Sequence, residues 1–166
     1  MNLKFIKQIT PPLLWKVMKY IFSTRETPMW AGNYLSWDEA KKECIGYDSQ
    51  IILDKCKNSL LQVKNGAAVY ERDSVIFDQI QYSWGLIAGL QKVALNSDGK
   101  LCVLDFGGSL GSSFFQNKDF LTIKDLKWCI VEQPNFIECG KKFFENDQLK
   151  FYYTVDECLQ NEQPNV

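Results

Sequence analysis

The sequence predicts an α/β protein with a parallel sheet, and two observations carry this prediction. From residue 99 onward, three short apolar runs alternate with segments of helical pattern in the order β-α-β-α-β. The first run, Leu101–Phe106, leads directly into a glycine-rich turn, and the second run ends at the acidic residue Glu132. Rossmann-like sites for nucleoside cofactors typically have this order: a strand, a glycine turn, a helix and a second strand that ends in a carboxylate.

Composition favours a folded chain and excludes several function classes. The 166 residues are 46% hydrophobic and 14% aromatic, which supports a sizeable core and argues against disorder. The net charge of −1, with no basic block, argues against a nucleic-acid partner.

The chain contains no histidine, which excludes a Ser-His-Asp triad, a Cys-His pair and a histidine base. Its six cysteines form no C-x-x-C pair, so we expect reduced core thiols, no metal site and a cytoplasmic location. Chemistry must then use carboxylates, Tyr, Lys, Cys or a reactive cofactor.

Residues 1–27 are expected to form a basic and apolar helix followed by a linker. No segment has the ~18 consecutive apolar residues of a transmembrane helix. The segment 11–22 combines lysines with bulky apolar residues, which is compatible with weak contact to a membrane surface or with packing on the domain or on a partner.

Residues 28–98 are expected to form a helical region that packs on the sheet. Ser36 and Glu39 make a capping box for a helix from about 37 to 44. A second helix is expected over 50–63, and a long one over 74–94, capped by Asp73.

Residues 99–166 are expected to form the cofactor-binding half of a Rossmann-like domain. The strands are predicted at 101–106, 126–132 and 149–155, with helices at 111–116 and 134–144 between them.

The glycine turn is the candidate ligand site. Gly107, Gly108 and Gly111 allow the backbone to approach a ligand closely, and the next helix offers free N–H groups to a carboxylate or phosphate. Glu132 can accept hydrogen bonds from ribose hydroxyls. No P-loop lysine follows, and Ser109 replaces the second glycine of the dinucleotide pattern. The alternative is a tight strand-to-helix turn without a ligand.

The turn resembles motif I of class I S-adenosylmethionine-dependent methyltransferases, a hydrophobic strand followed by Asp/Glu-x-Gly-x-Gly-x-Gly. Asp105, Gly107 and Gly111 match this pattern, and Ser109 departs from it. From about Pro28 onward the chain is also similar to an uncharacterised family of bacterial proteins regarded as such methyltransferases, whose genes often lie near surface-polysaccharide genes. The matching segments are Trp30-x-Gly32-x-Tyr34-x-x-Trp37, Gly46-Tyr47-Asp48, Tyr70-Glu71-Arg72-Asp73, Leu104–Gly111 and Val131-Glu132-Gln133.

This resemblance implies a site for S-adenosylmethionine and an acceptor that is a small molecule or a glycan precursor. Asp105, Gly107 and Gly111 would line the methionine end, and Glu132 would hold the ribose. Gln133 and Asp156 are candidates for the adenosine side, with helix capping as the alternative role of Asp156. The implied cofactor-binding set is Asp105, Gly107, Gly108, Ser109, Gly111, Glu132, Gln133 and Asp156.

A second cluster could close over the cofactor or the acceptor, with plain packing between regions as the alternative. Its members are Trp30, Tyr34, Tyr70, Glu71, Arg72 and Asp73. If the acceptor is a sugar hydroxyl, a base is useful, and the sequence does not select among Tyr70, Glu71 and Asp73.

Only the first three strands of the methyltransferase order 3-2-1-4-5-7-6 are expected in this chain. Gln163–Val166 looks like the lead-in to a fourth strand, which would leave strand 1 as an apolar edge. We therefore expect a truncated product with little activity alone, a homo-oligomer or partner that supplies the rest, or an edge covered by the N-terminal helices. The rival functions are an NAD(P)-dependent oxidoreductase half-site and a non-catalytic binding module.

Overall fold

The computed structural model describes residues 32–43, 46 and 49–166, and the chain divides into two compact units, Met1–Cys44 and Ile45–Val166. The expected helix at 11–22 lies outside the described residues. In the first unit, α3 spans Trp37–Glu43. Its Glu39 N–H donates to Ser36 Oγ at 3.3 Å, as the capping box requires, but the Glu39 carboxylate accepts from Leu35 N–H at 3.0 Å instead of from Ser36.

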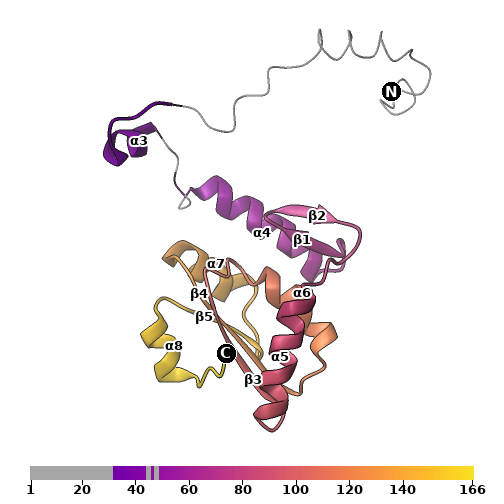
Figure 1. Ribbon diagram of the computed structural model, residues 1–166. Coiled ribbons are helices and arrows are strands. Elements are labelled where there is room, and N and C mark those ends of the chain that lie inside the picture. Colours follow the sequence, from indigo (N-terminus) through magenta and orange to yellow (C-terminus); the bar gives the residue numbers. More distant parts are fainter. Residues whose placement is uncertain (1–31, 44–45, 47–48) are drawn as a thin grey trace, which may run out of the picture. The chain divides into compact units, whose positions relative to one another are not determined.

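The second unit begins with one helix and a small two-stranded ribbon, and continues as an alternation of strands and helices (Figure 1). Its elements are α4 (Gln50–Lys64), β1 (Tyr70–Arg72), β2 (Val75–Phe77), α5 (Trp84–Asn96), β3 (Lys100–Phe106), α6 (Ser112–Leu121), β4 (Asp125–Val131), α7 (Pro134–Phe143), β5 (Leu149–Tyr152) and α8 (Val155–Asn161).

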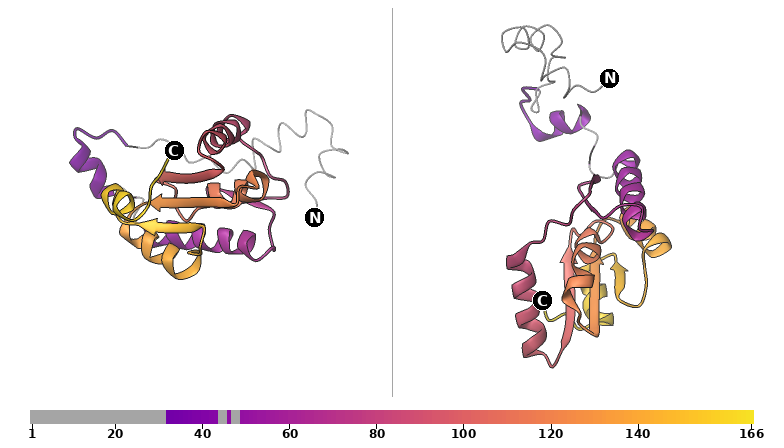
Figure 2. Two further views of the ribbon diagram at one scale, coloured as in Figure 1. Left: turned by 90° about the horizontal axis from the view of Figure 1, so that it is seen from below. Right: turned by 90° about the vertical axis from the view of Figure 1, so that its right-hand side faces the viewer.

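The main sheet has the order β3-β4-β5, and both pairings are parallel. The left panel of Figure 2 shows the three strands running side by side in one direction. The helices α6 and α7 connect consecutive strands, so each strand-helix-strand unit is a crossover that places the carboxyl ends of the strands at one edge. The prediction of an α/β fold with a parallel sheet is confirmed.

One face of the sheet forms the main core. Trp128 and Ile130 of the central strand β4 are almost completely buried there, beside Phe151 of β5. Helices α4, α5, α6 and α7 all contribute to this cluster. Because β4 is buried on both faces, its sequence is a nearly continuous apolar run.

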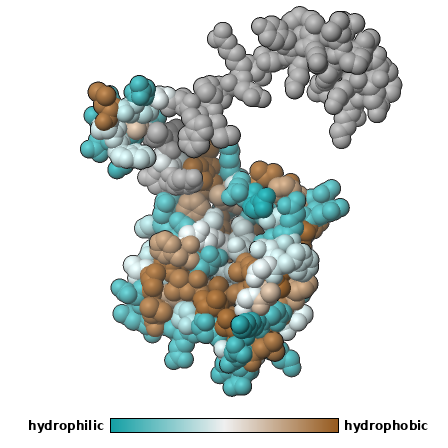
Figure 3. Space-filling model, viewed as in Figure 1, coloured by the Kyte–Doolittle hydropathy of each residue, from teal (hydrophilic) through white to brown (hydrophobic). Residues whose placement is uncertain are grey.

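The other face is covered by α8, which contacts β4 and β5. Cys129, Val131 and Cys158 form its small buried cluster. Beyond that cluster some apolar side chains are exposed, with Phe106 77% and Leu159 54% exposed. Figure 3 shows brown patches on the side of this unit where α8 and the C-terminus lie in Figure 1.

The outer edge of β3 is paired with the C-terminal residues. Leu104 N–H donates to the Val166 carbonyl at 2.8 Å, and Asn165 N–H donates to the Cys102 carbonyl at 2.9 Å. The Asn165 side chain accepts from Cys102 N–H at 2.9 Å and donates to the Lys100 carbonyl at 3.1 Å. The Asn165 side-chain amide thus bonds to the β3 backbone as a peptide group of a neighbouring strand would. Part of the β3 edge, which was predicted to be open and apolar, is therefore covered.

The predicted long helix over 74–94 is wrong. Asp73 and Ser74 have φ values of 52° and 66° and form the turn of the β1–β2 hairpin, in which Arg72 pairs with Val75. Two left-handed residues at a two-residue turn match the twist of antiparallel strands, and a helix cannot contain them. Only the later part of the expected span is helical, as α5, so the region 28–98 is not wholly helical.

Two other boundaries differ from the expectation. The helix after the glycine turn, α6, continues to Leu121 instead of ending near residue 116. The third strand stops at Tyr152 because α8 begins at Val155, with Thr154 as its N-cap.

Candidate functional site

The turn between β3 and α6 has a left-handed backbone at three positions. Gly107 and Gly111 have φ values of 76° and 97°, and Ser109 adopts 54°. A glycine would therefore be less strained at position 109 than the serine of this chain. Gly107 N–H also donates to the Val131 carbonyl at 2.9 Å, which fixes the turn against the end of β4.

Asp105 lies beneath this turn and supports it. Its Oδ2 accepts a hydrogen bond from Trp128 Nε1 at 2.9 Å. A Cβ atom at Gly108 would lie only 2.6 Å from Asp105 Cγ and 2.7 Å from Ile130 Cδ1. Burial raises the pKa of Asp105, the Trp128 hydrogen bond lowers it, and the charge of Glu132 raises it further. The Asp105 side chain therefore packs directly against Gly108 and supports the glycine turn from below.

Glu132 follows the last residue of β4 and reaches over the turn. Its Oε1 accepts from Gln133 N–H at 3.0 Å, and its Oε2 would be 3.8 Å from a Cβ atom at Gly107. Gln133 is the N-cap of α7, and Pro134 is its first helical residue. The chain therefore changes from strand to helix directly after Glu132. The carboxylate is thus held at the carboxyl edge of the sheet, beside the glycine turn.

The β1–β2 hairpin is joined to the same turn. Glu71 is 3% exposed; its Oε2 accepts from Ser74 N–H at 3.1 Å, and its Oε1 accepts from the hydroxyl of Ser112, the first residue of α6. Ser74 Oγ also contacts Cys56 Sγ of α4 at 3.2 Å. Side chains from α4, the hairpin and α6 therefore close around the glycine turn.

Two adjoining cavities lie at this place. One has a volume of about 710 Å³ and includes Glu132, Gln133 and Phe136 in its lining. The other, of about 240 Å³, includes Glu71, Arg72 and Asp105. They share five lining residues: Cys56, Asp73, Ser74, Gly107 and Ser109. The larger volume falls within the ~300–1,000 Å³ typical of cofactor sites.

The structure places most of the predicted site residues around these cavities. Asp105, Gly107, Gly108, Ser109, Glu132, Gln133, Glu71, Arg72 and Asp73 line one or both. Gly111 instead faces the core, since a Cβ atom there would be 3.1 Å from Leu149 Cδ2. Tyr70 is buried and stacks on Phe77, with ring centroids 5.6 Å apart, so it packs within the hairpin.

Of the three remaining predicted residues, one does not line the cavities, one belongs to the first unit and one lies outside the described residues. Asp156 is exposed in the first turn of α8, and it is not the cap, because Thr154 Oγ1 accepts from Glu157 N–H at 3.0 Å. Tyr34 belongs to the first unit, where its hydroxyl donates to Glu43 Oε2 at 3.0 Å. Trp30 lies outside the described residues.

Sequence reasoning missed Cys56, Ser74 and Phe136 as lining residues. Ser74 follows directly after the polar run 70–73, so a hairpin interpretation of that run would have included it. Cys56 and Phe136 are apolar-face residues of α4 and α7, and nothing in the pattern separates them from core residues.

The charged side chains that line the cavities are mainly acidic. Four carboxylates, those of Glu71, Asp73, Asp105 and Glu132, face one cationic side chain, that of Arg72, among the described lining residues. Carboxylates gathered in a partly enclosed space create a potential that favours a cationic ligand over an anionic one.

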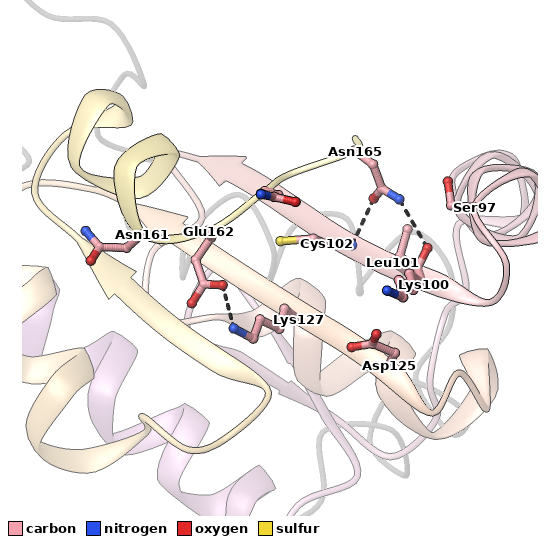
Figure 4. Close-up of a pocket in the computed structure, with 10 residues that line it drawn as sticks. Ser97, Lys100, Leu101, Cys102, Asp125, Lys127, Asn161, Glu162 and Asn165 are labelled. Carbon is pink, nitrogen blue, oxygen red and sulfur yellow. Dashed lines mark hydrogen bonds and ion pairs between the residues drawn. The ribbon is translucent and has the colours of Figure 1, made fainter.

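A separate cavity of about 490 Å³ lies over the amino ends of β3 and β4, near Lys100 and Asp125, at the other end of the strands from the glycine turn (Figure 4). Figure 4 shows Asn165 bridging to the β3 backbone and Glu162 paired with Lys127. None of the residues predicted for the cofactor site lines it.

Comparison with protein-family models, with curated proteins and with solved structures finds no match. Within the described part of the chain, no helix is long and apolar enough to cross a membrane. The same residues contain no group of three or more His, Cys, Asp or Glu side chains arranged to hold a metal ion.

Proposed function

We propose that this chain binds S-adenosylmethionine at the glycine turn and belongs to a methyltransferase that acts on a small molecule or a glycan precursor. The observation that carries the proposal is the combination of the turn with Glu132 held over Gly107 in a cavity of about 710 Å³. A carboxylate at the end of the neighbouring strand is positioned to accept hydrogen bonds from the two ribose hydroxyls of a nucleoside.

The charge of the cavities supports S-adenosylmethionine over NAD. S-adenosylmethionine carries a sulfonium and an ammonium group against one carboxylate, whereas the pyrophosphate of NAD is an anion. Four lining carboxylates attract the first ligand and repel the second. NAD also requires an anion site at the N-terminus of the helix after the glycine turn, and Glu71 already bonds to Ser112 there.

The residues of this chain would mainly position the two reactants. When bound, the cofactor supplies an electrophilic methyl group and its own leaving group, which suits a chain without histidine. Glu132 would hold the ribose, and the backbone at Gly107 and Ser109 would approach the methionine end. Asp73 lines both cavities from an exposed turn, so it is better placed than buried Tyr70 or Glu71 to accept a proton from an acceptor hydroxyl.

Replacement of Glu132 by Gln tests the proposal. We expect the affinity for S-adenosylhomocysteine to fall about tenfold to a hundredfold, because charge-assisted hydrogen bonds contribute about 1.5–3 kcal/mol each. Isothermal titration calorimetry measures the change, and Glu138→Gln, an exposed site on α7, is the matched control. Unchanged affinity in the Glu132 variant would refute the ribose assignment.

A non-catalytic binding module is the second candidate, and the open sheet face favours it. Phe106, next to the glycine turn, is 77% exposed instead of packed, so α8 leaves this end of β3 uncovered by the described residues. A module of this kind binds S-adenosylhomocysteine without turnover. Incubation with labelled S-adenosylmethionine and candidate glycan acceptors distinguishes the two, since only the enzyme transfers label.

A further inference from the structure

Glu71 is an unusual residue for the interior of a protein. It is 3% exposed, and it is the only carboxylate among the three buried polar side chains of the described residues. A buried carboxylate is costly unless hydrogen bonds and favourable charges compensate for the lost water. Both of its oxygens accept hydrogen bonds, one from Ser74 N–H and one from Ser112 Oγ.

The two partners of Glu71 belong to different elements, and both line the smaller cavity of the proposed cofactor site. Ser74 is the second residue of the left-handed hairpin turn, and Ser112 is the first residue of α6. Glu71 therefore ties the hairpin to the helix that follows the glycine turn. Its negative charge lies beside the N-terminus of that helix, where the helix dipole stabilises an anion.

This position is the one that a pyrophosphate takes in dinucleotide-binding folds. Here the chain's own carboxylate uses it, and the smaller cavity next to it is lined by Glu71, Asp73 and Asp105. An incoming phosphate would have to approach these charges in a space of about 240 Å³. A ligand with a positive centre would instead gain from them.

We propose that Glu71 is a specificity-determining residue that makes this site accept a cationic sulfonium nucleoside and reject a nucleotide carrying phosphate. The inference rests on the proposed function and adds to it the residue that sets the charge preference. Its mechanism is electrostatic: the buried carboxylate neutralises the helix N-terminus and adds a negative potential to the cavity. The hydrogen bonds hold that charge in place by fixing the hairpin turn.

The substitution Glu71→Gln separates this role from a structural one. Glutamine has nearly the same shape and can accept from Ser74 N–H, but it carries no charge. We expect the ratio of S-adenosylmethionine affinity to NAD affinity to fall about tenfold, because one unit charge is removed at short range. S-adenosylhomocysteine lacks the sulfonium charge, so its affinity should fall less than that of S-adenosylmethionine.

Two control variants complete the experiment. Asp119→Asn makes the same charge change at an exposed site near the far end of α6 and should leave the ratio unchanged. Ser112→Ala removes one hydrogen bond to Glu71 but keeps its charge, so it should alter the ratio far less than Glu71→Gln. Circular dichroism and urea unfolding establish that each variant is folded before titration calorimetry.

The outcomes are distinct. The expected fall in the ratio, confined to Glu71→Gln, supports the proposal. If wild-type protein prefers S-adenosylmethionine but Glu71→Gln weakens all three ligands equally, Glu71 is only structural, and the proposed function stands without this inference. If wild-type protein binds NAD as tightly as S-adenosylmethionine, both the proposed function and the role of Glu71 are wrong.

Discussion

Replacement of Gly108 by Ala tests the packing beneath the glycine turn. Gly108 has no left-handed φ, so the backbone itself tolerates alanine. The new Cβ would lie 2.6 Å from Asp105 Cγ, 2.7 Å from Asp105 Oδ2 and 2.7 Å from Ile130 Cδ1, well inside contact distance. Asp105 cannot move freely, because it accepts a hydrogen bond from Trp128 Nε1. We therefore expect the free energy of unfolding to fall by about 1–3 kcal/mol, as in other overpacked sites.

The assay is urea unfolding followed by tryptophan fluorescence, with Gly89→Ala as the matched control. Gly89 lies inside α5, and a Cβ atom there would meet nothing within 4 Å. This control should stabilise the protein by up to about 1 kcal/mol, since alanine is the better helix former. If Gly108→Ala unfolds within about 0.5 kcal/mol of wild type, the packing argument is refuted.

Three further predictions concern the turn and the sheet edge. Ser109→Gly should raise the free energy of unfolding by up to about 1 kcal/mol in urea titrations, because it relieves a φ of 54°; a loss would contradict the strain argument. Burial raises the pKa of Asp105 above 3.8, so folding favours its protonated form and stability should decrease as the pH rises from about 4 through the raised value. Asp105→Asn should remove that part of the pH dependence in thermal unfolding, and an unchanged profile would count against it. Asn165→Ala should cost about 1 kcal/mol in thermal unfolding and increase self-association in light scattering, because it uncovers the β3 edge; a variant as stable and monodisperse as wild type would disprove the edge role.

The sheet could be predicted from the sequence because its signals are local. The runs in β3 and β4 are nearly continuous and apolar, and the glycine turn and Pro134 mark where the chain changes direction. Asp105 and Glu132 could be assigned to one edge because parallel strands align their carboxyl ends there. These inferences depend on residues that are close in sequence.

The hairpin and the buried carboxylate could not be predicted in the same way. Ile76 and Phe77 continue a helical spacing into α5, and only the left-handed φ values of Asp73 and Ser74 break it. Neither residue is a glycine, so the sequence carries no clear turn signal. The contact between Glu71 and Ser112 joins residues 41 positions apart, and only the tertiary fold brings them together.

Titration of the purified chain with S-adenosylmethionine and with NAD at low ionic strength tests the central claim most directly. The claim is that carboxylates around the glycine turn form a site for a cationic nucleoside. We predict that S-adenosylmethionine binds at least about tenfold more tightly than NAD, and that added salt reduces the difference. Equal or tighter binding of NAD would contradict the account.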